Sequence, residues 1–442
     1  MVHKNKVPCM RTDTVVAKQG IVASSRACLG RFLMALAVLF ATMTSDAQAG
    51  FDATGSLATA RRLHVAVTLP SGQVLVAGGY STTGSDLASA ELYDPATGNW
   101  TSAGAFTRAR FWHAASMLLT GKALVVGGSN NQSQTLSSAQ LYDPAQNAWS
   151  AAGGLVTARN RHTATLLDSG KVLVVGGTNA AGTALSSAEL YDPTTNTWAP
   201  TAGPLATARY LHTATLLATG EVLVVGGYGN SGTSISSAER YNPGTDSWTA
   251  AGTLANARVR HAATLLASGQ VLVTGGQGVL SSAELYDRTA NAWSPVQPML
   301  APRQSHSATR LPTGLVLVAG GDQGTLALNS VELYDPISNI WSDAGTLVTA
   351  RENHTANLLP SGQVLVAAGA PGQTINAALD SAELYIDDAS LPTVSTTLQR
   401  PIRRAREAEM RGGSQMTGVA EISHRAAQRH DGVPEANQNR RF

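Results

Sequence analysis

Arg209-Tyr210-Leu211-His212-Thr213-Ala214-Thr215-Leu216-Leu217 is followed by Val222-Leu223-Val224-Val225-Gly226-Gly227, then by Ser237-Ala238-Glu239-Arg240-Tyr241-Asn242-Pro243 and by Trp248. The stretch consists of four short apolar runs separated by turn residues. It occurs seven times, and successive copies of its histidine are 49, 49, 50, 49, 45 and 48 residues apart. A period in this range indicates a solenoid, a propeller or an array. The seven histidines are His64, His113, His162, His212, His261, His306 and His354.

Each repeat predicts four β-strands and no helix. The runs around Thr213-Ala214-Thr215-Leu216 and Val222-Leu223-Val224-Val225 are too short for helices, are rich in aliphatic and β-branched residues, and end at turn residues. Ser237-Ala238-Glu239-Arg240-Tyr241 alternates small or apolar residues with polar ones, which is typical of a half-buried strand. The proline that follows it cannot continue a strand ladder. We therefore predict an antiparallel meander of four strands in each repeat.

The recurring residues resemble those of the kelch repeat, whose period is about 50 residues. A glycine pair ends the second run of six repeats, a tyrosine follows in all seven, and a tryptophan lies seven residues after the tyrosine in six. This resemblance covers residues 51–386 and implies an all-β, seven-bladed β-propeller with four antiparallel strands per blade. The tyrosines are Tyr93, Tyr142, Tyr191, Tyr241, Tyr286, Tyr334 and Tyr385, and the tryptophans are Trp100, Trp149, Trp198, Trp248, Trp293 and Trp341.

The seventh repeat lacks the tryptophan, and its place is taken from the other end of the chain. Trp100 lies 13 residues before His113, and Phe51 lies 13 residues before His64. Phe51 therefore occupies the tryptophan position of an N-terminal fourth strand. We predict that residues 51–58 complete the last blade, so that the closed ring has no free sheet edge at its seam.

The segments that flank the repeats differ from them in composition. Residues 1–49 combine basic residues, the apolar run Phe32–Ala41 and the sequence Ala47-Gln48-Ala49, which predicts a secretory signal cleaved after Ala49. The apolar run is shorter than the ~20 residues of a membrane span, which argues against an anchor. Both cysteines, Cys9 and Cys28, lie in this segment. We expect a secreted or periplasmic chain without cysteine, a propeller over residues 50–389 and a flexible arginine-rich tail over 390–442.

The charge balance argues against nucleic acid as a partner. Residues 50–389 contain 16 lysines and arginines against 22 aspartates and glutamates, a net charge of −6. A nucleic-acid-binding domain normally has a basic excess. The tail of residues 390–442 contains nine arginines and five acids, a net charge of +4. We expect a monomer with no membrane span after signal removal.

An arginine stands three residues before each repeat's histidine, and the third run of most repeats contains a glutamate. Such groups could form an ionisable ring around a channel, but a catalytic site needs a few unlike groups that converge. The preferred interpretation is structural, with arginine, histidine and glutamate tying the linker between blades to its own sheet through charge-assisted hydrogen bonds. Ligands spread round a ring cannot converge on one zinc ion, so we expect no metal and no cofactor. These residues include Arg110, His113, Arg159, His162, Arg209, His212, Arg258, His261, Glu189, Glu239 and Glu284, while Gln140 replaces the glutamate in one repeat.

The residues that vary between repeats are the candidates for ligand binding. In an antiparallel meander, the loop before the first strand and the loop between the second and third strands open on the same face. The first of these loops holds two variable residues between each arginine and histidine, and function usually lies in variable loops on a rigid scaffold. Unconstrained surface drift is the alternative explanation. Aromatic and arginine residues at these positions can anchor ligands. The predicted ligand-binding residues are Arg62, Phe111, Trp112, Arg161, Tyr210, Arg260 and Glu352.

Two kelch-type enzymes help to frame the function. The propeller resembles that of galactose oxidase, but this resemblance implies a copper site with a tyrosine cross-linked to a cysteine, and the predicted mature chain has no cysteine. A kelch-type N-acetylneuraminate epimerase, a periplasmic sugar mutarotase, would need an acid/base pair, for which Glu352 with His354 or Arg161 with Glu352 are candidates. We favour a non-enzymatic propeller that binds a saccharide or a partner protein on the loop face, with a mutarotase as the alternative. Aromatic faces stack on sugars, and arginines bind carboxylates.

Overall fold

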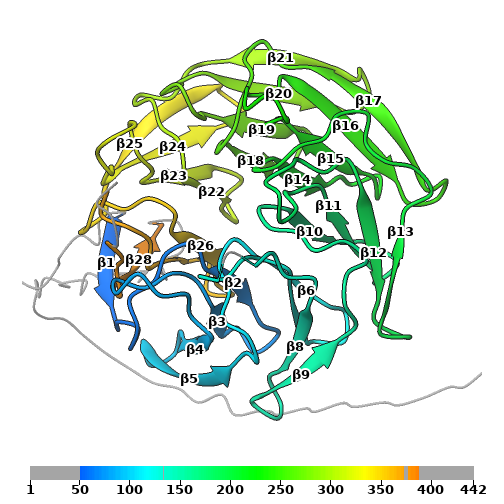
Figure 1. Cartoon of the computed structure of the whole chain (residues 1–442). Coiled ribbons are helices and arrows are strands. Elements are labelled where there is room, and N and C mark those ends of the chain that lie inside the picture. The colour runs from blue at the N-terminus through cyan, green and yellow to red at the C-terminus, as the bar shows by residue number, and fades with distance from the viewer. Residues whose placement is uncertain (1–49, 133, 373–376, 388–442) are drawn as a thin grey trace, which may run out of the picture. The chain divides into compact units, whose positions relative to one another are not determined.

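A computed structural model describes residues 50–132, 134–372 and 377–387. These residues form seven four-stranded antiparallel sheets arranged as blades around a ring (Figure 1). The predicted all-β, seven-bladed propeller is therefore confirmed. The predicted signal of residues 1–49 and the tail of residues 390–442 lie outside the described residues. Within the described part of the chain, no helix has the length and apolar character that crossing a membrane requires.

Each blade runs from an inner strand near the centre of the ring to an outer strand at its rim (Figure 1). Blade 1 contains β2 (Val65–Thr68), β3 (Val74–Ala77), β4 (Ser89–Asp94) and β5 (Asn99–Ala105). Blade 2 contains β6 (Ala114–Met117), β7 (Ala123–Val126), β8 (Ala139–Asp143) and β9 (Ala148–Ala152). Blade 3 contains β10 (Thr163–Leu166), β11 (Val172–Val175), β12 (Ala188–Asp192) and β13 (Thr197–Pro200).

The remaining blades repeat the same order. Blade 4 contains β14 (Thr213–Leu216), β15 (Val222–Val225), β16 (Ser237–Asn242) and β17 (Ser247–Thr253). Blade 5 contains β18 (Ala262–Leu265), β19 (Val271–Thr274), β20 (Ala283–Asp287) and β21 (Ala292–Val296). Blade 6 contains β22 (Ser307–Arg310), β23 (Val316–Ala319), β24 (Ser330–Asp335) and β25 (Ile340–Thr346). Blade 7 contains β26 (Thr355–Leu358), β27 (Val364–Ala367), β28 (Ala382–Ile386) and β1 (Gly50–Thr54).

The hydrophobic core lies between neighbouring blades. The second strand of each blade is buried over its whole length because a sheet packs on both of its faces. One cluster joins Leu223 and Val225 of β15 to Val271 and Val273 of β19 and to Tyr286 of β20. Each blade therefore buries its apolar face only against its neighbours, as in other repeat proteins.

The N-terminal strand closes the ring. Strand β1 pairs with β28, and Phe51 lies opposite Tyr385 in the register that places Trp100 opposite Tyr93 in blade 1. Figure 1 shows the two strands side by side, although they come from opposite ends of the propeller. The prediction that Phe51 takes the tryptophan position is confirmed. Its ring lies 5.3 Å from that of Tyr385, centroid to centroid.

The glycine pairs let backbones from two blades approach each other. Gly226 and Gly227 at the end of β15 have φ of 60° and 98°. A Cβ on Gly226 would lie 2.4 Å from the carbonyl oxygen of Arg258 in the next blade, and one on Gly227 would lie 2.7 Å from that of Tyr210. A side chain at either position would push these backbones apart, so the pair sets the spacing of the loops that form the candidate site. Blade 7 has Ala368 at the first position, with φ of 58°.

Candidate ligand-binding site at the central cavity

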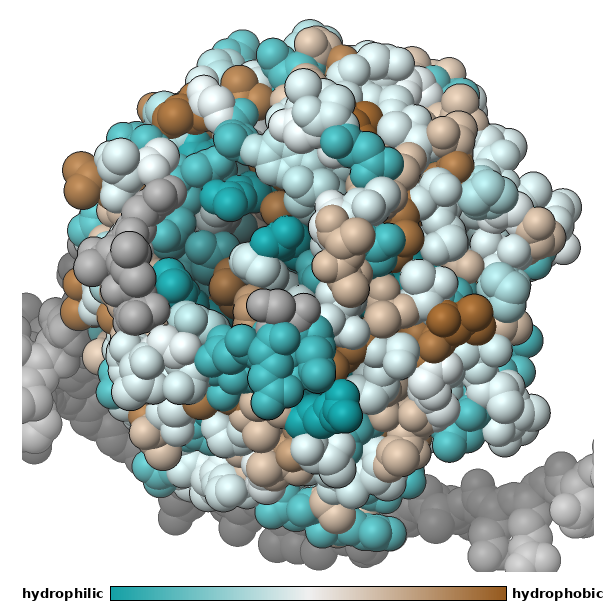
Figure 2. Space-filling view, viewed as in Figure 1, coloured by the Kyte–Doolittle hydropathy of each residue, from teal (hydrophilic) through white to brown (hydrophobic). Residues whose placement is uncertain are grey.

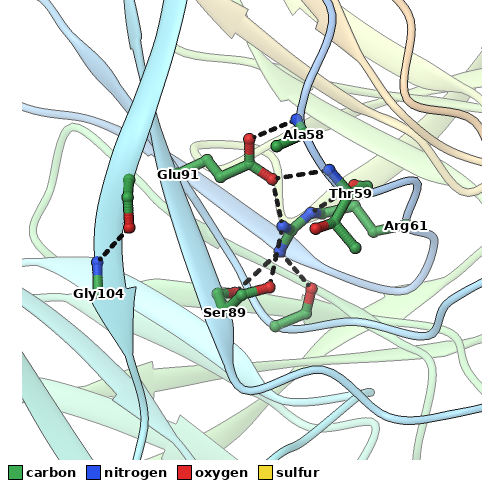
Figure 3. Close-up of polar contacts among 8 residues, drawn as sticks. Ala58, Thr59, Arg61, Ser89, Glu91 and Gly104 are labelled. Atoms are coloured by element: carbon green, nitrogen blue, oxygen red, sulfur yellow. Dashed lines mark hydrogen bonds and ion pairs between the residues drawn. The ribbon is translucent and has the colours of Figure 1, made fainter.

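A buried arginine ties the incoming linker of each blade to that blade's own sheet. In blade 1, the fully buried Arg61 donates from Nη2 to Glu91 Oε1 at 2.6 Å (Figure 3). Its Nη1 donates to the carbonyl oxygens of Gly78 and Ser89, and Glu91 accepts two further hydrogen bonds from linker amides. We call the seven equivalent residues the framework arginines: Arg61, Arg110, Arg159, Arg209, Arg258, Arg303 and Arg351. Five more form the same ion pair at 2.5–2.8 Å: Arg159–Glu189, Arg209–Glu239, Arg258–Glu284, Arg303–Glu332 and Arg351–Glu383.

The histidines join each blade to the preceding one, which differs from the expectation that they bind their own sheet. His212 of blade 4 is hydrogen bonded to Thr163 of blade 3 at 3.0 Å. Equivalent bonds across blade boundaries are made by His64, His113, His261, His306 and His354. Burial, followed by the nearby framework arginine, lowers the pKa of His64, His162, His261 and His354 to about 3. The histidines are therefore neutral at pH 7.

Blade 2 holds its framework arginine without a carboxylate. Arg110 is fully buried and donates to the carbonyl oxygens of Gly127 and Ser138, while Gln140 takes the place of the glutamate. Its Cζ lies 5.3 Å from the ring centroid of Phe106, an aromatic residue where blade 1 has a leucine. Burial lowers the pKa of Arg110 to about 10, and nearby Arg108 adds to this shift. The cation–π contact replaces part of the missing electrostatic stabilisation.

Between the framework arginine and the histidine of each blade, the second variable residue has a left-handed backbone. These seven residues have φ of 51–55°: Leu63, Trp112, Arg161, Leu211, Arg260, Ser305 and Asn353. Such a backbone costs roughly 1 kcal/mol or more for a residue other than glycine. Hydrogen bonds between blades hold it, since Arg161 N donates to Trp112 O at 2.9 Å and Leu211 N donates to Arg161 O at 3.1 Å. The side chains of six of these residues line a cavity at the centre of the ring.

The central cavity has a volume of about 580 Å³. It is lined by Arg62, Leu63, His64, Trp112, His113, Arg161, His162, Tyr210, Leu211, His212, Tyr228, Arg260 and Asn353. These residues include three arginines, which we call the mouth arginines (Arg62, Arg161 and Arg260), and no acidic residue. Because the four histidines are neutral, the lining has a charge of about +3 near pH 7. Figure 2 shows hydrophilic residues gathered around a hollow near the middle of the ring.

The mouth arginines are not held by hydrogen bonds or salt bridges, although Arg260 and Arg62 act electrostatically on the Glu352 carboxyl and lower its pKa. Within residues 50–132, 134–372 and 377–387, their side chains make no hydrogen bond and no salt bridge, and the buried Arg62 Nε is unsatisfied. Aromatic rings hold two of them instead. Arg161 Cζ lies 3.6 Å from the ring centroid of Trp112 and 5.8 Å from that of Tyr210, and Arg62 Cζ lies 5.6 Å from that of Tyr80. Burial and, to a smaller extent, Arg260 lower the pKa of Arg161. The stacked guanidinium keeps its N–H groups available for an anion.

The structure brings together five of the seven predicted ligand-binding residues. Arg62, Trp112, Arg161, Tyr210 and Arg260 line the central cavity. Phe111 lines an adjoining groove, and Glu352 is not among the lining residues of either space. The cavity lining also includes Tyr228, Leu63, Leu211 and Asn353, which lie on the variable loops but were not among the predicted ligand-binding residues. The sequence signal for Tyr228 is its place directly after a glycine pair. A residue at this place pairs with the first variable residue of the same blade, as Tyr228 does with Tyr210.

Glu352 forms a carboxyl pair with Asp322, a residue that sequence reasoning did not select. Asp322 is fully buried, and its Oδ1 accepts hydrogen bonds from Gln304 Nε2 at 2.7 Å and Gly324 N at 2.8 Å. Burial and the hydrogen bond to Asp322 raise the pKa of Glu352 to about 8, so its carboxyl is mainly protonated at pH 7. His354, the partner considered for Glu352 from the sequence, is hydrogen bonded to Ser307 instead.

The donor set does not fit a resident metal. Among the described residues, no group of three or more histidine, cysteine, aspartate or glutamate side chains could hold a metal ion. The histidines each lie at a different blade boundary, and the mouth of the cavity supplies arginine and aromatic side chains.

Comparisons with known proteins agree with this architecture. A family model described as the KLHDC2/KLHL20/DRC7 kelch-repeats domain matches residues 36–227 and 161–369. A fungal alcohol oxidase of the AA5 family, solved with copper, has a TM-score of 0.63 at 18% identity over 76% of each chain. The structure of YjhT has a TM-score of 0.50 at 14% identity over 63% of this chain and 95% of that one. At these identities the two structures show a shared fold. The comparison with curated proteins gave no significant match. Because the family model spans most of the seven repeats, the chain belongs to the kelch-repeat family.

Proposed function

We propose that this chain is an exported binding protein whose central cavity takes a saccharide that carries a carboxylate. The observation behind the proposal is that the cavity lining has three arginines without hydrogen bonds or salt bridges and no acidic residue. A guanidinium binds a carboxylate through two parallel hydrogen bonds, and aromatic faces suit the C–H surface of a sugar ring. A volume of about 580 Å³ falls in the ~300–1,000 Å³ range of small-ligand sites.

The stacking of Arg161 on Trp112 indicates which aromatic rings are free to contact the sugar ring. One face of the Trp112 ring is covered by the Arg161 guanidinium. Trp112 therefore orients Arg161, and the rings of Tyr210 and Tyr228 are the candidates for contact with the sugar. These two rings lie 5.4 Å apart, centroid to centroid, on neighbouring loops of blade 4.

A thermal-unfolding screen of the full chain tests the proposal. Glucuronate and galacturonate are compared with glucose and galactose, which have the same ring without the carboxylate. A ligand at 100 times its dissociation constant adds about 2.7 kcal/mol to the free energy of unfolding, so a uronate should raise the melting temperature clearly. The parent sugars should have little effect. Equal shifts with both classes, or none, would contradict the proposal, and binding of an acidic protein partner instead would replace it.

Arg161→Met and Arg310→Gln form the matched variants for that screen. Arg161→Met removes the stacked guanidinium from the cavity, whereas Arg310→Gln removes an exposed arginine at the end of β22, outside the cavity lining. The uronate shift should disappear in the first variant and persist in the second. Loss of the shift in both variants would indicate a general charge effect.

A sugar mutarotase is a second candidate because of the Asp322–Glu352 pair. A carboxyl group with a pKa of about 8 can donate and accept a proton near neutral pH, as general acid/base chemistry requires. Glu352 is only 4% exposed, which favours binding over catalysis. Under this second hypothesis, the protein accelerates the interconversion of glucuronate anomers in a proton NMR assay, and Glu352→Gln stops the acceleration while leaving binding intact. An anomerisation rate equal to that of buffer would rule it out.

A further inference from the structure

A groove adjoins the central cavity over blades 2 and 3. Its volume is about 560 Å³, and the two spaces are neighbours that share Arg62, Leu63, Trp112 and Arg161 in their lining. Each space falls in the ~300–1,000 Å³ range of small-ligand sites. A ligand that occupies both is therefore longer than one that fills the cavity alone.

The chemistry of the groove differs from that of the cavity. Beyond the two shared arginines, the groove lining carries no charge and consists mainly of amide and hydroxyl side chains: Ser129, Asn130, Asn131, Thr135, Asn160, Thr178 and Asn179. Tyr80, Phe111 and Trp112 form its aromatic side, with the Phe111 ring centroid 5.3 Å from that of Tyr80 and 4.9 Å from that of Trp112. Amides, hydroxyls and aromatic rings together suit an uncharged, hydroxyl-rich ligand.

The floor of the groove is preorganised. Thr178 Oγ1 donates to Asn160 Oδ1 at 2.8 Å, and Asn160 Nδ2 donates to Thr135 Oγ1 at 3.2 Å. Asn160 and Thr178 are buried, so ligand binding does not need to order them. Above them, Asn179 Oδ1 accepts hydrogen bonds from the amides of Ala181 and Thr183, both at 3.0 Å. Within the described residues Asn179 Nδ2 donates to no group, so this amide is fixed in place with its donor free.

We infer that the ligand is an acidic oligosaccharide whose carboxylate-bearing residue binds the mouth arginines and whose neighbouring, uncharged residue lies in the groove. This inference rests on the proposed function. It specifies the orientation of the bound ligand, with the carboxylate at the centre of the propeller and the hydroxyl groups of the neighbouring residue over blades 2 and 3.

Isothermal titration calorimetry on the full chain tests the inference with three probes. These are glucuronate, a disaccharide of glucuronate linked to a neutral hexose, and digalacturonate, which has a second carboxylate. The mixed disaccharide should bind at least about tenfold tighter than glucuronate, a gain of roughly 1.4 kcal/mol. Digalacturonate should gain less, because the groove offers no further cation. Equal affinities for glucuronate and the mixed disaccharide would overturn the inference while leaving the proposed function intact. Failure of all three probes to bind would overturn both.

Asn179→Asp provides the matched variant. It keeps the oxygen that accepts from the Ala181 and Thr183 amides and removes the free donor. Affinity for the mixed disaccharide should fall about tenfold, toward that of glucuronate, while affinity for glucuronate stays within about twofold. Asn99→Asp, which places the same charge on an exposed residue of β5, should change neither. An equal loss for both ligands in Asn179→Asp would contradict a separate groove subsite.

Discussion

The framework arginines and the mouth arginines use the same side chain in opposite ways. The seven framework arginines are fully buried, and each donates to backbone carbonyls, with a glutamate partner in six blades. The three mouth arginines lie one or two residues after a framework arginine in sequence. Within the described residues, their side chains make no hydrogen bond and no salt bridge. An arginine whose hydrogen bonds are all made has a structural role, whereas an arginine at a cavity without a salt bridge is a candidate to bind an anionic ligand.

Acid should disrupt the framework more than any single substitution. Each buried histidine has a pKa below its ordinary 6.5, to about 3 for four of them. Below pH 6.5 the unfolded histidines bind protons and the folded ones do not, so the free energy of unfolding falls by up to about 1.4 kcal/mol per pH unit for each histidine. Their contribution is constant above pH 6.5.

Urea unfolding monitored by tryptophan fluorescence between pH 4 and 8 measures this effect. The unfolding midpoint should fall steeply below pH 6, and the histidines should add no change to it between pH 7 and 8. A proton-uptake measurement at pH 5 should register several protons bound per molecule on unfolding. A midpoint that does not change between pH 7 and pH 5 would mean that the histidines are not buried in their neutral form.

Replacing one arginine of each kind by methionine should separate stability from binding. Arg209→Met removes the ion pair with Glu239 and leaves a buried carboxylate without its cation. We expect a loss of roughly 3–5 kcal/mol in the free energy of unfolding. Arg161→Met should change it by less than about 1 kcal/mol, since that side chain makes no hydrogen bond. Urea denaturation of both variants checks the contrast, and similar losses in the two would remove the distinction between the classes.

The framework was predictable from sequence because the same residues recur at the same spacing. The period identified the arginine and glutamate pairs and placed Phe51 at the tryptophan position that β1 occupies. The period could not tell which blade the histidines bond to, since every blade has the same residues to offer. It also carried no information on Asp322 and Glu352, because these residues lie on variable loops of blades 6 and 7 and meet only when the two neighbouring blades pack together.

Exchanging glutamine and glutamate between blades 2 and 3 tests what the carboxylate contributes. Gln140→Glu gives Arg110 the acidic partner that the other framework arginines have, and it should stabilise the protein by about 1 kcal/mol. Glu189→Gln removes that partner from Arg159 in blade 3, where no aromatic ring replaces it, and should destabilise by roughly 2 kcal/mol. Melting temperatures of the two variants provide the measurement. Destabilisation by Gln140→Glu would indicate that Phe106 is a full substitute for the carboxylate.

The smallest expected effect comes from the carboxyl pair. The pKa of Glu352 is raised from 4.5 to about 8, so in that window the folded chain holds a proton that the unfolded chain has released. The free energy of unfolding should therefore fall as pH rises toward 8, by at most about 1 kcal/mol per pH unit, and be flat above it. Glu352→Gln keeps a donor to Asp322 and should abolish this slope between pH 7 and 8, where the histidines do not titrate. If Glu352→Gln leaves the pH dependence of the free energy of unfolding unchanged, a group other than Glu352 causes it.

The most direct test of the role of the mouth arginines is the affinity difference between glucuronate and glucose for the full chain, measured by calorimetric titration before and after Arg161→Met. The two sugars share a ring and differ in the carboxylate. We predict that glucuronate binds the wild-type chain at least about tenfold tighter than glucose and that this preference is lost in the variant. Equal affinity for the two sugars in the wild type, or a preference that survives Arg161→Met, would contradict the assignment of the unpaired guanidinium groups to an anionic ligand.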